Sequence, residues 1–81
     1  MPPPKAIEVT PQIDYNLLVT FDNNERRIFD VKPYLDFYPY KELKNLILFY
    51  TVKLTDQGVE WIHGQDIDPD DLYNNSVLIE V

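Results

Sequence analysis

Four aspartates lie close together near the C-terminal end of the chain: Asp66, Asp68, Asp70 and Asp71. Grouped carboxylates are the ligands that hard cations such as Ca²⁺ prefer. An EF-hand counted from Asp66 fails, because its sixth position is Asp71 where glycine is needed and its twelfth is Val77 where a bidentate glutamate belongs. Helix capping accounts for these acids instead, with Asp68 as the N-cap and Asp70 and Asp71 at the positive end of the helix dipole. We therefore expect no metal site here.

His63 is the only histidine of the chain and the only side chain suited to general acid–base chemistry near neutral pH. Asp66 or Asp68 would orient its ring after the break that Gly64 introduces. A nucleophile is missing, because there is no cysteine and Ser76 is the only serine. The two glycines stand singly, so they form no phosphate-binding loop. The sequence predicts no catalytic residues and no cofactor.

Aromatic residues gather around Pro33 and Pro39, and tyrosine gives large contact area at low entropic cost in protein interfaces. We expect Tyr34 and Phe37 to form a lid over the sheet. For Tyr38 and Tyr40, a lid and a partner-binding surface are equally good interpretations. The residues selected as interaction candidates are Tyr38, Tyr40, Trp61 and His63.

Length, charge and composition exclude several classes of protein. The 81 residues suffice for one domain, and 14 acids against 7 bases give a net charge of −7, the wrong sign for direct nucleic-acid binding. The longest apolar run, residues 46–50, is far shorter than the roughly 20 residues of a membrane helix, and no signal peptide precedes it. We expect a cytoplasmic protein without a membrane segment.

Two alternating segments on either side of Asp22-Asn23-Asn24 predict the first β-hairpin. A three-residue loop keeps the apolar residues on one face, because it pairs Leu17 with Phe29. Such a loop usually ends in a residue with positive φ, which Asn24 can supply. A short strand over residues 6–9, stopped by Pro11, should lie at the edge of the sheet.

A second hairpin is predicted by a run rich in β-branched and aromatic residues, 47–55, and by the return strand 59–63. The three-residue turn Asp56-Gln57-Gly58 would pair Lys53 with Trp61 and set Thr51 opposite His63. Single helical turns are expected over residues 33–36 and 41–46, because proline suits a first helical position and Pro39 blocks extension.

The segment after Gly64 predicts a short helix followed by a closing strand. Pro69 follows the N-cap Asp68 at the first helical position, Tyr73 lies in the helix, and residues 76–81 alternate as a strand. The fold class is therefore α+β: a small antiparallel sheet of about five to six strands, with two hairpins, terminal strands and short helical turns. Residues 1–5 are expected to form an extended proline-rich leader, and residues 6–81 the single domain.

The chain resembles the bacterial domain-of-unknown-function 2442 family from about Ile7 to Tyr73. The specific half is the segment Trp61-x-x-Gly64-x-Asp66-Ile67-Asp68-Pro69-Asp70-x-Leu72-Tyr73, and two departures are Asn24 in place of a glycine and His63 in place of an asparagine. The resemblance implies a small α+β fold without an established activity. It also implies a neighbouring gene for a small protein, in an arrangement like a toxin–antitoxin pair.

These observations predict a non-catalytic protein-interaction module, the acidic member of a toxin–antitoxin-like pair. Its partner would be a basic protein encoded by a neighbouring gene, reached through a sheet edge or the tyrosine-rich loop. A homodimer through a sheet edge is a variant of this hypothesis. The alternative is a small enzyme or ligand-binding domain that uses His63 and the segment Asp66–Asp71.

Overall fold

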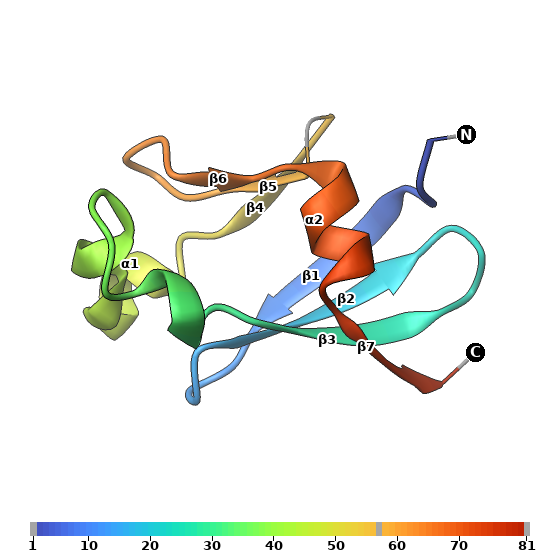
Figure 1. Ribbon diagram of the computed structural model, residues 1–81, viewed down its shortest axis with the longest axis horizontal. Coiled ribbons are helices and arrows are strands. Elements are labelled where there is room, and N and C mark those ends of the chain that lie inside the picture. Colours follow the sequence, from blue (N-terminus) through green and yellow to red (C-terminus); the bar gives the residue numbers. More distant parts are fainter. Residues whose placement is uncertain (1, 57, 81) are drawn as a thin grey trace.

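The computed structural model describes residues 2–56 and 58–80, and it forms two antiparallel sheets around one core (Figure 1). Sheet A has the strand order β1-β2-β3-β7, with β1 Ala6–Pro11, β2 Asn16–Phe21, β3 Arg26–Asp30 and β7 Val77–Glu80. Sheet B has the order β4-β5-β6, with β4 Lys53–Thr55, β5 Gly58–Glu60 and β6 Asp66–Ile67. The α+β class is confirmed, but the strands divide between two sheets.

The helical elements are short. Two 3₁₀ turns, η1 Lys32–Tyr34 and η2 Tyr40–Lys44, follow β3, and η2 leads into α1 Leu46–Phe49. The helix α2 Pro69–Asn74 connects β6 to β7, and it lies between the two sheets at the centre of the view (Figure 1). None of the described helices is long and apolar enough to cross a membrane.

The first hairpin follows the predicted register. Leu17 pairs with Phe29 and Val19 with Arg27, while the backbone N–H of Phe21 donates to the Glu25 carbonyl at 2.9 Å. Asn24 has a φ of 71°, so the left-handed residue that closes the loop is confirmed. This register turns alternate β2 side chains into the core.

The predicted strand over residues 47–55 is wrong in its first half, which is the helix α1. The Asn45 side chain accepts from the backbone N–H of Ile47 at 2.9 Å, so it caps the helix as N-cap asparagines do. Within this helix Phe49 is fully buried, whereas Ile47 is 80% exposed. The helix cap at Asn45 and the burial of the Phe49 ring therefore outweigh the β propensity of this segment.

The second hairpin is also one residue out of its predicted register. Lys53 pairs with Glu60 rather than with Trp61, and Thr55 pairs with Gly58. The predicted turn includes residue 57, which lies outside the described residues. Gly58 does have positive φ, at 105°, but it belongs to β5, and its missing side chain lets the Ile67 carbonyl of β6 approach closely.

The core joins both sheets and α2 in one cluster. The Tyr15 and Phe49 rings form a T-shaped pair with centroids 5.3 Å apart, and Phe49 packs on Trp61 with centroids 6.0 Å apart. The buried apolar residues are Leu17, Val19, Phe21, Phe29, Val31, Leu35, Leu43, Phe49, Val59, Trp61, Ile67 and Leu72. Because strands of both sheets contribute, neither sheet has a separate core.

Candidate functional site

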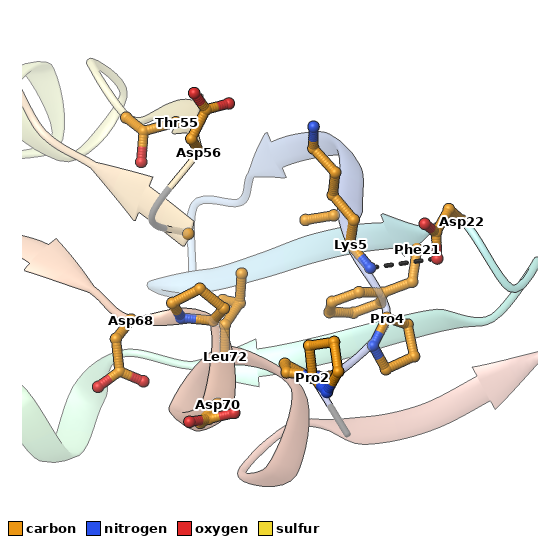
Figure 2. Close-up of a pocket in the computed structure, with 14 residues that line it drawn as sticks. Pro2, Pro4, Lys5, Phe21, Asp22, Thr55, Asp56, Asp68, Asp70 and Leu72 are labelled. Atoms are coloured by element: carbon orange, nitrogen blue, oxygen red, sulfur yellow. Dashed lines mark hydrogen bonds between the residues drawn. The ribbon is translucent and has the colours of Figure 1, made fainter.

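A groove of about 780 Å³ lies where the N-terminal segment, sheet A, sheet B and the start of α2 meet (Figure 2). Its volume is in the range of pockets that accept ligands or side chains of a partner. The lining residues are Pro2, Pro3, Pro4, Lys5, Ala6, Phe21, Asp22, Thr55, Asp56, Gly58, Asp68, Pro69, Asp70 and Leu72.

Four aspartates from three separate segments are among the residues that line this groove. Asp22 comes from the turn between β2 and β3, Asp56 follows β4, and Asp68 and Asp70 come from the start of α2. Among the described residues that line the groove, Lys5 is the only basic one. The groove therefore carries a net negative charge, and like charges gathered at one concave surface favour a cationic ligand.

The N-terminal segment is anchored beside these acids by two backbone contacts. The Lys5 N–H donates to an Asp22 carboxylate oxygen at 3.1 Å (Figure 2). The Asp22 N–H donates in turn to the Lys5 carbonyl at 2.8 Å. Pro3 and Pro4, in the predicted leader, are half-buried, while Pro2 is exposed. The proline rings thus form one apolar wall of the groove.

The groove aspartates differ in whether their carboxylates already have a partner. The Asp68 side chain accepts from the Asp71 N–H at 2.8 Å, so the predicted N-cap is confirmed, with Pro69 at the first helical positions. The exposed carboxylates of Asp70 and Asp56 have no hydrogen-bond or ion-pair partner within residues 2–56 and 58–80. These two are the free acceptors of the groove.

Asp66 and Asp71 lie outside the groove lining. Asp66 is in β6, where its backbone carbonyl accepts the hydroxyl of Tyr40 at 2.9 Å. Within the described part of the chain, no group of three or more histidine, cysteine, aspartate or glutamate side chains is arranged to hold a metal ion. The aspartate segment is therefore divided between a helix cap, a short strand and the groove wall.

His63 has a different partner from the one expected. Its Nδ1 contacts Glu42 Oε2 at 2.6 Å, so Glu42 takes the orienting role predicted for Asp66 or Asp68. The buried Gln65 also donates through Nε2 to Glu42 Oε2 and, at 3.1 Å, to the Pro39 carbonyl. The hydrogen bonds from His63 and then from Gln65 lower the pKa of Glu42 below its ordinary value of 4.5.

A second, smaller pocket of about 430 Å³ surrounds this pair. It is lined by Tyr38, Pro39, Lys41, Glu42, His63 and Gln65. The aspartates after Gly64 do not line it, and Thr51 is not opposite His63, because its hydroxyl accepts from the Ile62 N–H at 3.1 Å instead. The structure therefore does not bring His63 and the acidic segment into one site.

The aromatic candidates differ widely in exposure. Trp61 is fully buried, and its indole N–H donates to the Phe49 carbonyl at 2.9 Å, so its prediction as an interaction residue is wrong. Tyr40 is half-buried against the core. Tyr38 is 91% exposed and free for contact, and Phe37 is 66% exposed, which corrects its predicted role as a lid.

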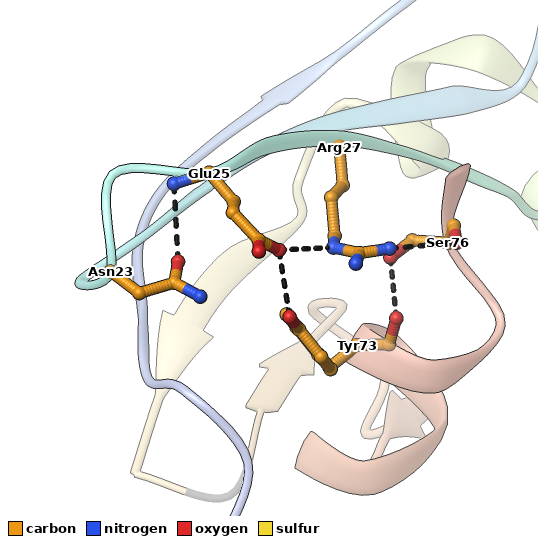
Figure 3. A network of polar contacts seen from close by, with 5 residues as sticks. All are labelled: Asn23, Glu25, Arg27, Tyr73 and Ser76. Carbon is orange, nitrogen blue, oxygen red and sulfur yellow. Dashed lines mark hydrogen bonds and ion pairs between the residues drawn. The ribbon is translucent and has the colours of Figure 1, made fainter. Parts of the chain in front are cut away.

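Tyr73 joins α2 to sheet A through a polar network (Figure 3). Its hydroxyl donates to Glu25 Oε1 at 2.7 Å, and the same oxygen accepts from Arg27 Nε at 2.8 Å. The Arg27 guanidinium lies 4.2 Å from the centre of the Tyr73 ring and also donates to the Ser76 carbonyl at 3.1 Å. Tyr73 thus has the structural role expected of the motif, with partners that lie far away in sequence.

Gly64 has a φ of 92°, with open space where a side chain would begin, and its N–H donates to the Trp61 carbonyl at 2.9 Å. It forms a turn, but the predicted strand over residues 59–63 is wrong in its second half, because β5 already ends at Glu60. Sequence reasoning missed the groove residues Asp22 and Asp56 and the histidine partner Glu42. The available signal was that both hairpin turns carry an aspartate, but their proximity to α2 depends on how the two sheets pack.

Comparison with known proteins identifies a family for this chain. Searches of curated proteins and of solved structures returned no match. A family model described as "Protein of unknown function (DUF2442)" matches residues 6–77, from the start of β1 into β7. The chain belongs to that family.

Proposed function

We propose that this protein is a non-catalytic interaction module whose acidic groove binds a basic segment of a partner protein. The observation that carries the proposal is the convergence of Asp22, Asp56, Asp68 and Asp70, from three segments of the chain, on one groove. A net charge of −7 extends the negative field around it. Such a field increases the rate of encounter with a basic partner and disfavours acidic ones.

The chemistry of the groove suits arginine or lysine side chains. These residues bury an apolar stem and leave a charged head near water or a carboxylate. The proline rings and Ala6 supply apolar surface, and Asp56 and Asp70 supply unpaired carboxylates beside it. A charge-assisted hydrogen bond from a guanidinium to either carboxylate would be about twice as strong as a neutral one.

In its biological setting, the proposal makes this chain the acidic member of a toxin–antitoxin-like pair in the bacterial cytoplasm. Its partner would be a basic protein encoded by a neighbouring gene. The exposed Tyr38, which lines the pocket beside His63 and not the groove, would be a separate contact surface. Co-expression with the product of the adjacent gene and co-purification of a complex would support this setting, whereas two proteins that never associate would refute it.

The groove itself is tested with an arginine-containing probe. We expect an eight-residue peptide of alternating glycine and arginine, titrated into isotopically labelled protein, to shift the amide signals of Lys5, Asp22, Asp56 and Asp70. The double variant Asp56→Asn/Asp70→Asn should weaken binding about tenfold, because two charge-assisted contacts are lost. Added salt should weaken binding to the unsubstituted protein, since exposed charges are screened.

The matched control changes net charge equally and leaves the groove intact. Glu8→Gln/Asp36→Asn removes two acids, neither of which lines the groove. Glu8 pairs with Thr20, on the face of sheet A away from the core. Equal weakening by both double variants would show that only overall charge matters, and the groove assignment would then be discarded.

A second candidate function is binding of a small ligand beside His63. The specific observation in its favour is the contact between His63 and Glu42 in the pocket of about 430 Å³. A carboxylate can only accept, so the hydrogen bond makes Nδ1 the protonated nitrogen when His63 is neutral and leaves Nε2 as a base. A fragment screen that shifts the signals of Lys41, His63 and Gln65 would favour this function, and an unresponsive pocket would remove it.

A further inference from the structure

The strand β7 is an unprotected edge of sheet A. It pairs with β3 on one side, and no described strand pairs with its other side. All four of its residues are exposed, and three of them in succession are apolar: Val77 at 67%, Leu78 at 46% and Ile79 at 50%. An exposed strand with unpaired backbone groups and apolar side chains is a template for pairing with another strand.

The opposite edge of sheet A is protected in the ways that proteins normally protect an edge. The strand β1 contains Pro11 and carries Glu8 on the solvent side. Each of these features discourages a further strand from adding. The strand β7 contains neither proline nor lysine. The two edges of one sheet therefore differ in whether they can accept a partner.

Charge identifies what can approach β7. Glu80 is the only charged residue of the strand, and it forms an ion pair with Arg26 of β3. The adjacent Arg27 is paired with Glu25. This edge is therefore charge-balanced, although the whole chain carries −7. A second copy of an acidic protein is repelled by the acidic groove but meets no excess charge at β7.

An apolar row crosses the outer face of sheet A beside this edge. Leu18 pairs with Ile28, and Ile28 pairs with Val77, so the three side chains lie side by side on the face away from the core. Leu18 and Ile28 are half-buried. With a two-fold axis at Leu78, Val77 would lie opposite Ile79 of the second copy, which adds apolar contact to the backbone hydrogen bonds.

We propose that the protein self-associates through β7, which pairs antiparallel with β7 of a second copy and joins the two four-stranded sheets. The antiparallel arrangement is self-complementary, because each strand presents the same backbone groups to the other. The strand is short, so the interface is small and the expected dissociation constant is on the order of 0.1 mM. This inference uses a different surface from the acidic groove and does not depend on the proposed function.

Sedimentation equilibrium on the full chain, up to about 1 mM protein, tests the proposal. We expect a reversible monomer–dimer equilibrium that Val77→Lys/Ile79→Lys abolishes, because two lysines from each copy would face each other. The matched control Ile13→Lys/Ile47→Lys makes the same change of charge at residues that are 73% and 80% exposed, away from β7, and should retain the equilibrium.

A mixing experiment separates loss of the interface from loss of the fold. The lysine variant and the variant Val77→Glu/Ile79→Glu should each be monomeric alone and should form a heterodimer when mixed, because opposite charges then pair across the edge. A monomeric unsubstituted protein at about 1 mM, a dimer that survives the lysine substitutions, or equal loss in the control would each overturn the proposal.

Discussion

Glu25 is held by two donors that come from different parts of the chain, the hydroxyl of Tyr73 and the guanidinium of Arg27. The hydrogen bond from Tyr73, followed by that from Arg27, lowers the pKa of Glu25 below its ordinary value of 4.5. In the unfolded chain the same carboxyl binds a proton more readily. Its contribution to stability is therefore complete above pH 4.5 and is lost as the pH falls through the lowered folded value.

We predict that Glu25→Gln flattens the acid side of the stability profile, because this carboxyl then no longer titrates. Urea unfolding midpoints between about pH 6 and about pH 2 would measure the effect. Tyr73→Phe removes one of the two donors and should flatten the profile only in part. An unchanged acid slope in Glu25→Gln would show that the network does not contribute.

Trp61 provides a prediction about packing. Trp61→Phe leaves a cavity and removes the donor to the buried Phe49 carbonyl, so we expect a loss of about 2–4 kcal/mol in the free energy of unfolding. Tyr38→Phe, at a ring that is 91% exposed, should change stability by less than about 0.5 kcal/mol. Urea denaturation of both variants measures the difference in the free energy of unfolding. Similar losses in the two variants would contradict the assignment of Trp61 to the core.

At the scale of elements, two glycines with positive φ have different neighbours. A Cβ at Gly58 would lie 2.1 Å from the Ile67 carbonyl oxygen, whereas a Cβ at Gly64 would meet nothing within 4 Å. The first glycine therefore permits β5 and β6 to approach, and the second only permits a turn. The distinction is one of tertiary packing, because the two φ values, 105° and 92°, are similar.

We predict that Gly64→Ala costs about 1–2 kcal/mol, the usual penalty for a side chain in the left-handed region. Gly58→Ala should cost more than about 3 kcal/mol, because a backbone clash adds to that penalty. Thermal unfolding of both variants provides the comparison. Equal costs would mean that the β5–β6 approach is not as close as the structure indicates.

The capped start of α2 supports a third element-scale test. Asp68→Ala removes the acceptor of the Asp71 N–H and should cost about 1 kcal/mol. Asp68→Asn keeps a capping oxygen and should cost much less, although it removes the charge from the groove. Chemical denaturation distinguishes the two variants, and equal losses would assign the effect to charge rather than to capping.

At the scale of the whole molecule, the two sheets share one core cluster, and Phe49 contacts both Tyr15, directly before β2 of sheet A, and Trp61, directly after β5 of sheet B. A sheet that cannot keep a core of its own should not remain folded without the other. We therefore predict one cooperative unfolding transition. Trp61 fluorescence and amide hydrogen exchange in β2 should give the same free energy of unfolding, and separate values would show two independent units.

Much of the fold could be read from local patterns. Parity of the apolar residues led to the register of the first hairpin, and Asn24 has the positive φ that its loop needs. Asp68 and Pro69 marked the start of α2. The second hairpin was less predictable, because both faces of residues 47–55 carry apolar residues. Alternation of apolar and polar residues therefore could not identify the strand, and the cap at Asn45 starts a helix there instead.

The candidate site depended far more on packing. Asp22, Asp56 and Asp70 lie on separate segments, and only the arrangement of two sheets and α2 brings them to one groove. Glu42 is 21 residues from His63, and no local spacing relates them. The sequence by itself determined the first hairpin with its turn and the capped start of α2, since these depend on residues a few positions apart. The tertiary structure alone decided which side chains meet, because contacts between distant segments follow from how the shared core is filled.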